Sequence, residues 1–275
     1  MSLRFINRTQ MLQLSAALLT VCLASHHAFA DEPVHLRILS YNIHHAEGID
    51  RKLNLERIAK IIRSVKPDLV ALQEVDQNTK RTKNVDQPAE LARLTGMNVA
   101  FGPNIEFQGG KYGNAVLSRF PIANQNNLLL PNLDQGEQRG VLSVELNAPE
   151  LPRPLVLLAT HLDHRAENQE RLLSSSTINQ MVFDKPNQLT LLAGDMNATI
   201  GSPTIRQLDT TWTRVNSAPM PTIPVDRPKQ QIDFVMFRPK QNWKVVEVRI
   251  LDSSVASDHR AIFAVLEFVP SAITK

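Results

Sequence analysis

The stretch Gln188-Leu189-Thr190-Leu191-Leu192-Ala193-Gly194-Asp195-Met196-Asn197 joins an apolar run to two polar side chains, Asp195 and Asn197. A short apolar run between turn-forming residues is typical of a strand that is buried on both faces. A carboxylate that ends such a strand is costly to bury unless it is paired or binds a cation. We therefore predict a buried strand at residues 188–194, with Asp195 and Asn197 at its carboxyl end. An Asx turn that only closes the strand is the alternative.

The first half of the chain repeats this pattern, because Leu69-Val70-Ala71-Leu72 precedes Gln73-Glu74. Each half contains a strand, a polar cluster, a helix, a proline and a second strand. In the first half, strands are predicted at residues 36–43 and 68–74, with a helix at 54–65 and Pro67 between them. In the second half, strands are predicted at residues 155–161 and 188–194, with a helix at 167–183 and Pro186 between them. This order predicts a duplicated β-α-β unit in an α/β fold. Polar residues after the strands would then meet at one sheet edge, where such folds bind ligands.

The segments outside the two units also have recognisable patterns. Residues 77–87 are polar and are predicted to be a loop, and residues 211–229 are predicted to be irregular. A short helix is predicted at residues 88–95, and further strands at residues 98–101, 114–118, 140–146, 231–237, 244–250 and 261–268. Because no linker or shift in composition separates these segments, we expect one domain.

The first 30 residues have the pattern of a secretory signal peptide. Arg4 and Arg8 precede a mostly apolar stretch, and Ala28-Phe29-Ala30 offers a cleavage point after Ala30. We therefore expect a single catalytic domain at residues 31–275, exported to the periplasm or secreted. An uncleaved membrane anchor is the alternative, but the apolar run is shorter than the span of about 20 residues that a bilayer requires. We expect no stable membrane span after cleavage, and a monomer.

Composition limits the chemistry and the partners. The leader carries two of the 30 basic residues and none of the 27 acidic ones, which leaves a formal charge of +1 on residues 31–275. The one cysteine, Cys22, lies in the leader, so the mature domain has no thiolate ligand or cysteine nucleophile. A nearly neutral domain with 5% aromatic residues lacks the basic stripe and the stacking platforms typical of nucleic-acid binders.

Four more ionisable residues follow or interrupt apolar runs. Glu74 follows a predicted buried strand, Asp233 lies inside a strand pattern, and Asp258-His259 precedes the last strand. A hard divalent cation would stabilise such carboxylates, and Asp233 is suited to orienting His259. The alternatives are a Glu74–arginine ion pair and a structural role for His259.

Taken together, the polar segments resemble the endonuclease/exonuclease/phosphatase superfamily. The matching segments occur in the order of that family and span residues 36–268. They are Ser40-Tyr41-Asn42, Leu72-Gln73-Glu74, Gly113-Asn114-Ala115-Val116-Leu117-Ser118-Arg119, Thr160-His161, Gly194-Asp195-Met196-Asn197, Ile232-Asp233-Phe234 and Ser257-Asp258-His259. The resemblance implies a four-layer αββα sandwich of two packed mixed β-sheets flanked by helices.

The resemblance also implies roles for eight residues in a Mg²⁺-dependent phosphoester hydrolase, with Mn²⁺ as the alternative cation. Glu74 would be the main metal carboxylate, supported by Asn42 and Asp258. Asp195, oriented by Asn197, would activate the attacking water. His259, oriented by Asp233, would contact the scissile phosphate, and His161 would be a second phosphate ligand. Members of the family differ over whether the aspartate or the histidine is the base, and the sequence leaves both open.

Several further residues are candidates for binding substrate. Asn114 lies in a turn that family members use to touch substrate, Arg139 precedes a strand, and Arg81 belongs to the basic stretch Lys80-Arg81-Thr82-Lys83. A surface salt bridge is the alternative for Arg139, and a solvated loop for Arg81. His44, His45 and His164 would widen the polar site. Because His44 and His45 would alternate on a strand end, we expect one of them at most to face it. The oxygen-rich surroundings argue against a zinc site.

The substrate is less constrained than the reaction. We expect a phosphodiesterase or phosphatase that acts on a small or lipid-derived phosphoester. A secreted metal-dependent endonuclease is the second hypothesis, which the charge and aromatic content disfavour. A non-catalytic binding module on the same fold is the third, but such a module should have lost at least one of the eight residues.

Overall fold

Two parallel strand pairs occupy the centres of two sheets. Strand β1 (His35–Asn42) pairs with β2 (Leu69–Gln77), and β7 (Leu155–His161) pairs with β8 (Leu189–Asp195). Helix α1 (Leu55–Val65) connects the first pair and helix α3 (Gln169–Gln180) the second. The predicted duplication of a β-α-β unit is therefore confirmed.

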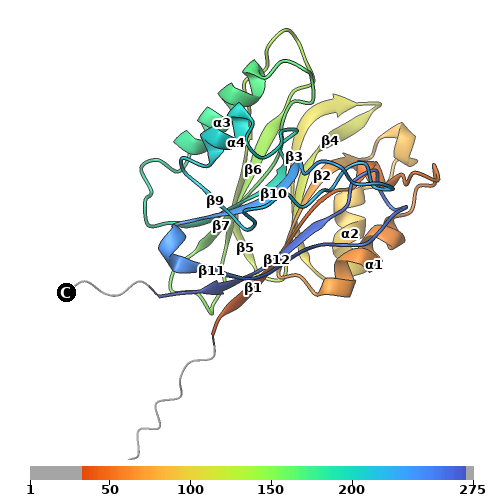
Figure 1. The fold of residues 1–275 in the computed structure, drawn as a ribbon. Coiled ribbons are helices and arrows are strands. Elements are labelled where there is room, and N and C mark those ends of the chain that lie inside the picture. Colours follow the sequence, from red (N-terminus) through yellow and green to blue (C-terminus); the bar gives the residue numbers. More distant parts are fainter. Residues whose placement is uncertain (1–32, 271–275) are drawn as a thin grey trace, which may run out of the picture. The chain divides into compact units, whose positions relative to one another are not determined.

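The computed structural model describes residues 33–270, and the leader predicted for residues 1–30 lies outside the described residues. The first sheet has the strand order β11-β12-β1-β2-β4-β3 and the second has the order β5-β6-β7-β8-β10-β9 (Figure 1). The other strands are β3 (Asn98–Phe107), β4 (Gly110–Ser118), β5 (Ile122–Leu129), β6 (Gly140–Leu146), β9 (Thr213–Arg214), β10 (Asp233–Arg238), β11 (Trp243–Ile250) and β12 (Ile262–Phe268). The other helices are α2 (Gln87–Thr95), α4 (Pro203–Leu208) and the 3₁₀ turns η1 (His44–Ala46), η2 (Lys80–Thr82) and η3 (Lys240–Asn242).

The sheets pack face to face and the α-helices cover their outer faces, as Figure 1 shows. Side chains alternate along each central strand, so Ile38 of β1 lies in the core between the sheets and Leu39 lies in the core under helix α1. Helices α3 and α4 cover the second sheet in the same way, with Ile178 and Ile205 against its outer face. The predicted four-layer sandwich is confirmed. Among the described residues, no helix has the length and apolar character needed to cross a membrane.

The hairpin β3–β4 is longer than predicted, and strands β5 and β9 and helix α4 were missed, β9 lying within residues 211–229 that were predicted to be irregular. Glycine and proline usually mark turns, so Gly102, Pro103 and Gly113 concealed the strand pattern. Gly113 is needed here because a Cβ atom would lie 2.0 Å from the carbonyl oxygen of Gly102 on β3. Strand β5 was missed because it lies at the edge of the second sheet, where most of its residues are exposed, and its centre is a run of four polar residues.

Strand β2 does not end at Glu74, as the sequence predicted, but continues to Gln77. Its register with β4 shifts between Leu72 and Val75, and Glu74 has a φ angle of 59°. This irregularity is a β-bulge, a device that re-aims a side chain within a paired strand. The bulge directs Glu74 toward the sheet edge where the strands β1, β7 and β8 end.

Candidate active site

The predicted polar residues meet at one edge of the two sheets. Strands β1, β7 and β8 end there at Asn42, His161 and Asp195. Strand β10 runs antiparallel to β8, so its first residue, Asp233, lies opposite Asp195. The residues before β12 reach the same edge because β12 is antiparallel to β1. Residues that are far apart in the sequence are therefore brought together by strand direction.

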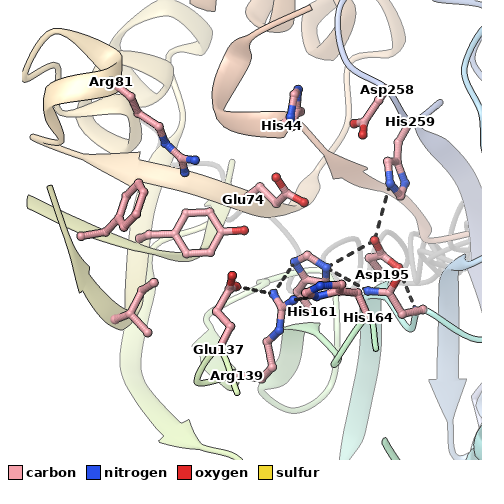
Figure 2. A pocket seen from close by; sticks show the side chains of 14 residues that line it. His44, Glu74, Arg81, Glu137, Arg139, His161, His164, Asp195, Asp258 and His259 are labelled. Carbon is pink, nitrogen blue, oxygen red and sulfur yellow. Dashed lines mark hydrogen bonds and ion pairs between the residues drawn. The ribbon is translucent and has the colours of Figure 1, made fainter. Parts of the chain in front are cut away.

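A cavity of about 330 Å³ opens at this edge (Figure 2). Eight of the eleven predicted site residues line it: Glu74, Arg81, Arg139, His161, Asp195, Asn197, Asp258 and His259. Asn42 and Asp233 are buried behind the cavity wall and hydrogen-bond to residues that line it. Asn114 does not line the cavity. It is buried, and its Nδ2 donates to the carbonyl oxygen of Gly140.

Asn42 links the two acidic residues on either side of the cavity. Its Nδ2 donates to Oε1 of Glu74 at 3.0 Å and to Oδ2 of Asp195 at 3.2 Å. Its Oδ1 accepts a hydrogen bond from the backbone N–H of His44 at 3.1 Å. Asn42 is 1% exposed, so these bonds are shielded from water. The amide therefore holds a carboxylate of the first sheet in a fixed position relative to a carboxylate of the second.

Asp195 is a buried carboxylate with a strongly perturbed pKa. Burial, followed by the charge of Asp233, raises its pKa from 3.8 to about 7. His259 and hydrogen bonds from the Asn197 N–H and the Asn42 amide oppose this rise. A group with a pKa near neutrality can both accept and release a proton at physiological pH.

His259 and Asp233 form a buried pair. Nδ1 of His259 lies 2.9 Å from Oδ2 of Asp233, and its Nε2 lies 3.7 Å from Oδ2 of Asp195. Burial alone would lower the pKa of His259, but the Asp233 carboxylate reverses this effect and raises the pKa to about 10. His259 therefore carries a positive charge at neutral pH, and its Nε2 side faces Asp195.

Arg139 and two histidines, His161 and His164, line the cavity next to Asp195. Arg139 is 2% exposed and donates to Nδ1 of His161 at 3.1 Å and to Nδ1 of His164 at 3.0 Å. Its Nη1 also lies 2.8 Å from Oε1 of Glu137. Burial, followed by the charge of Arg139, lowers the pKa of His161 well below its usual value. His161 is therefore neutral, and its Nε2 lies 3.5 Å from Oδ2 of Asp195.

One side of the cavity is partly apolar, which the sequence did not reveal. Ile105, Phe107 and Tyr112 of the β3–β4 hairpin line it together with Arg81. The guanidinium carbon of Arg81 lies 4.7 Å from the ring centre of Phe107 and 5.2 Å from that of Tyr112. Two nitrogens of Arg81 bind Asp76, so much of its charge is already neutralised. The adjacent Gly113-Asn114 motif is the one sequence signal that could have pointed to this hairpin.

Two groups of side chains among the described residues have the composition and spacing to bind a metal ion. The first is Asp195, Asp233 and His259, which are all buried. The donors fit a divalent cation, although from the sequence we expect catalytic roles for these residues and metal binding by Glu74. The carboxylates of Glu74 and Asp258 also line the cavity, so these two residues offer oxygen ligands for a cation as well.

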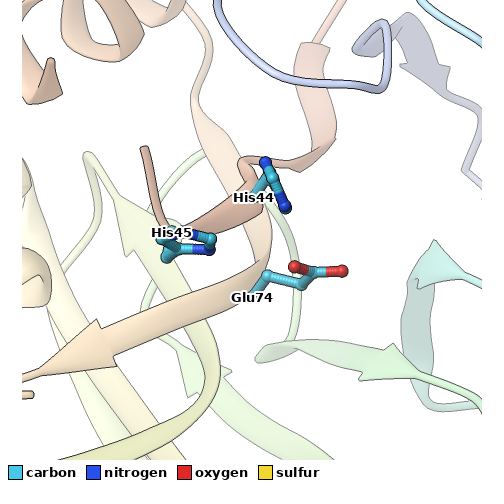
Figure 3. Close-up of side chains that lie close together, drawn as sticks. All are labelled: His44, His45 and Glu74. Atoms are coloured by element: carbon cyan, nitrogen blue, oxygen red, sulfur yellow. The ribbon is translucent and has the colours of Figure 1, made fainter. Parts of the chain in front are cut away.

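The second group is His44, His45 and Glu74 (Figure 3). The expectation that the two histidines alternate on a strand end is wrong, because β1 ends at Asn42 and η1 follows. His44 and His45 have φ angles of 44° and 43°. Burial, followed by the charge of Arg81, lowers the pKa of His45 to about 4. Both rings lie near Glu74, but only His44 lines the cavity.

The sequence and the fold were compared with those of known proteins, and the chain belongs to one known family. The sequence model of the Endonuclease/Exonuclease/phosphatase family matches residues 39–259. YbhP of Escherichia coli (strain K12), an uncharacterized protein, is 29% identical over 214 residues, which cover 72% of this chain and 83% of YbhP. The structure of an endonuclease/exonuclease/phosphatase from Beutenbergia cavernae DSM 12333 matches with a TM-score of 0.71 and 24% identity, over 87% of this chain and 73% of that chain. A mannosyl-6-phosphatase, Bt3783 of Bacteroides thetaiotaomicron VPI-5482, matches with a TM-score of 0.70 and 16% identity, over 86% and 100% of the two chains.

Proposed function

The chain belongs to the endonuclease/exonuclease/phosphatase family and is a phosphoester hydrolase, and we propose that it requires Mg²⁺. We further propose that its substrate is a small or lipid-derived phosphoester. Attack by an activated water, in line with the leaving group, is the proposed reaction. The observation that carries the proposal is the hydrogen bonding of Asn42 to both Glu74 and Asp195. These hydrogen bonds place Glu74, a carboxylate suited to binding a metal ion, beside Asp195, a carboxylate whose pKa suits a general base.

Asp195 is the proposed base. Its raised pKa matches the operating pH, as general catalysis requires. His259 is unsuited to that role because its raised pKa keeps it protonated. In the proposed step Asp195 takes a proton from water, the water oxygen bonds to phosphorus, and the bond from phosphorus to the leaving oxygen breaks. The leaving oxygen then takes up a proton from the solvent, and Asp195 releases to the solvent the proton that it took from water.

The positive and polar groups around Asp195 are the proposed phosphate ligands. His259 carries a charge that Asp233 holds in place, and the Nε2 atoms of His259 and His161 both lie near Asp195. Arg139 orients His161, and its own charge is paired with Glu137. Phosphoryl transfer depends on positioning and on stabilising charge on the phosphoryl oxygens. These groups are suited to that task.

Glu74, Asn42 and Asp258 are the residues that would hold Mg²⁺, with Mn²⁺ as an alternative ion. The fit rests on the donor chemistry, since Glu74 and Asp258 offer carboxylate oxygens in the cavity and Mg²⁺ typically uses one or two carboxylates. Asn42 orients Glu74 through its Nδ2. When bound, the cation polarises the phosphoryl group and stabilises the leaving alkoxide.

The cavity supports a small substrate. Its volume of about 330 Å³ is at the low end for small-molecule sites. The hairpin side chains Phe107 and Tyr112 offer an apolar face for the leaving group. A structural relative, Bt3783, is described as a mannosyl-6-phosphatase, so this fold accommodates a small phosphoester. The binding-module hypothesis loses support because Asn42 and the other proposed catalytic residues are all retained.

Export and oligomeric state are also part of the proposal. The signal-peptide pattern of residues 1–30 supports a periplasmic or secreted enzyme. We further propose that it acts as a monomer.

A metal-dependent activity panel tests the function. Purified protein would be assayed with bis-p-nitrophenyl phosphate, inositol phosphates, phospholipids, RNA and plasmid DNA, each with Mg²⁺ and with chelator. Mg²⁺-dependent hydrolysis of a small or lipid phosphoester, lost in Asp195→Asn, is the expected result. Activity that persists unchanged in chelator would refute the metal dependence. Rapid plasmid nicking that His259→Ala abolishes would favour the endonuclease instead.

A further inference from the structure

The turn η1 holds two imidazoles against Glu74 in an uncommon backbone conformation. His44, His45 and Ala46 have φ angles of 44°, 43° and 62°, and Glu74 has 59°. Positive φ angles are uncommon for residues other than glycine, and a run of three is maintained only where the surrounding structure enforces it. The consequence is that one ligand atom each from His44, His45 and Glu74 lie within 4.8 Å of one another (Figure 3).

The ring nitrogens of both histidines are arranged as in a metal site. Nδ1 of His44 lies 3.0 Å from the carbonyl oxygen of Glu47, so the N–H on Nδ1 donates there and Nε2 keeps its lone pair. Nε2 of His45 lies 3.8 Å from the Glu47 carboxylate, and Nδ1 of His45 is buried with no hydrogen-bond partner. Histidines that bind a metal usually direct their other ring nitrogen at a carbonyl or carboxylate. Glu47 supplies a carbonyl oxygen within hydrogen-bond distance of His44, and its carboxylate lies beside His45 at 3.8 Å, beyond that distance.

An unpaired nitrogen in a residue that is only 8% exposed destabilises the protein unless a partner binds it. A cation shared with Glu74 would be such a partner for His45. Two imidazoles and one carboxylate form the ligand set that Zn²⁺ uses in sites with one open position. Mg²⁺ prefers oxygen ligands and is poorly matched to two imidazoles.

We propose that His44, His45 and Glu74 bind a transition-metal ion of the Zn²⁺ class, with Glu47 orienting both histidines. The sequence argued against zinc because the surrounding pattern is rich in oxygen ligands, but the positive φ angles bring two nitrogens to Glu74. Glu74 would then be a ligand both of this ion and of the Mg²⁺ ion in the proposed function. This inference rests on that function only through the shared carboxylate, because it concerns binding and not hydrolysis.

Metal binding to the full chain tests the proposal without an activity assay. Zn²⁺ would be titrated into chelator-treated protein by calorimetry, and Co²⁺ by visible absorption, in the presence of excess Mg²⁺. We expect one equivalent of Zn²⁺ to bind, and the intense Co²⁺ bands that four or five ligands produce. Glu47→Gln should weaken binding about 10-fold, and His44→Ala and His45→Gln should each weaken it further.

Controls separate the proposal from other outcomes. His35→Gln, at the opposite end of β1, should bind Zn²⁺ like the wild type. Thermal unfolding of each variant shows whether it is folded. If the histidine variants do not fold, Glu47→Gln still tests the proposal, because it retains all three ligands. Zn²⁺ affinity within 2-fold of the wild type in Glu47→Gln and in a folded His44→Ala would overturn the proposal. A wild-type protein that binds Zn²⁺ but has no phosphoesterase activity would instead count against the proposed function alone.

Discussion

Asn42 donates a hydrogen bond to Asp195 over 3.2 Å, although 153 positions separate the two residues in the chain. Asn42 ends the strand β1 of the first sheet, and Asp195 ends the strand β8 of the second. The bond therefore crosses between the two halves of the sandwich at the edge where the cavity opens. It also stabilises the ionised form of a carboxylate that burial would otherwise keep protonated.

We expect Asn42→Ala to lower both activity and stability. Removing the amide leaves Asp195 and Glu74 without a shared donor, and the loss of one partner of a buried polar group costs about 1–3 kcal/mol. The rate on the best substrate should fall on the order of 10²-fold because Asp195 loses its orientation and more of its population is protonated. Urea unfolding and steady-state kinetics measure the two effects. Asn126→Ala, on the exposed face of β5, is the matched control and should change neither.

Glu74→Gln should weaken Mg²⁺ binding while leaving the fold intact. The introduced amide is nearly the same size as the carboxylate and could keep a hydrogen bond to Asn42, but it has no charge to attract the cation. We expect the Mg²⁺ concentration that gives half-maximal activity to rise at least about 10-fold. The measurement is a Mg²⁺ titration of activity, with chelator-treated protein as the starting point. An unchanged Mg²⁺ dependence in Glu74→Gln would contradict the assignment of Glu74 as the main ligand.

His259 should make the stability of the metal-free protein depend on pH. Asp233 raises the pKa of His259 from 6.5 to about 10, so the folded protein retains a proton that the unfolded chain releases. This contribution is complete below about pH 6.5 and is lost as the pH rises to about 10. The difference in free energy of unfolding between wild type and His259→Gln should shrink by up to about 1.4 kcal/mol per pH unit in that window.

Urea unfolding in chelator at several pH values between about 7 and 10 would measure this difference. His35→Gln is the control because His35 lies at the other end of β1 and is partly exposed. A difference between wild type and His259→Gln that stays constant over the window would mean that Asp233 does not hold the proton on His259.

The sequence predicts the site well where a residue follows a regular strand. Asp195 and His161 each end a buried apolar run, and strand direction then brings them together. Glu74, which was predicted to bind metal from a strand end, lines the cavity, but the strand end was wrong because β2 continues to Gln77. A bulge depends on the register with a neighbouring strand, here between Leu72 and Val75, and a single sequence pattern does not contain that information.

Two other features could not be predicted for similar reasons. The turn of His44 and His45 requires positive φ angles, which neither residue favours, so a regular strand was the natural expectation. Phe107 and Tyr112 reach the cavity through a hairpin whose glycines and prolines look like loop residues. In both cases the tertiary structure overrides a local preference, and that occurs at the candidate site.

Arg139→Lys should lower the rate more than it lowers substrate affinity. The guanidinium of Arg139 binds Nδ1 of His161 and Nδ1 of His164 with two different nitrogens, which a single ammonium group does not reproduce. His161 would lose its fixed orientation beside Asp195, so we expect kcat to fall on the order of 10²-fold. Steady-state kinetics separate kcat from KM. A change confined to KM would mean that Arg139 only binds substrate.

Phe107→Ala should discriminate between substrates according to their leaving groups. Phe107 and Tyr112 line the cavity from the β3–β4 hairpin, whereas Asp195 ends β8 and His259 precedes β12, so we expect the two rings to contact the leaving group without affecting the base. We expect a loss of about 10-fold in kcat/KM for an apolar or aromatic leaving group, which corresponds to about 1.4 kcal/mol. Methyl esters of the same phosphate should be affected little, because they do not reach the hairpin. Phe183→Ala, a change at an exposed phenylalanine outside the cavity, is the control. Equal losses for both kinds of substrate would indicate that Phe107 supports the hairpin and does not select the leaving group.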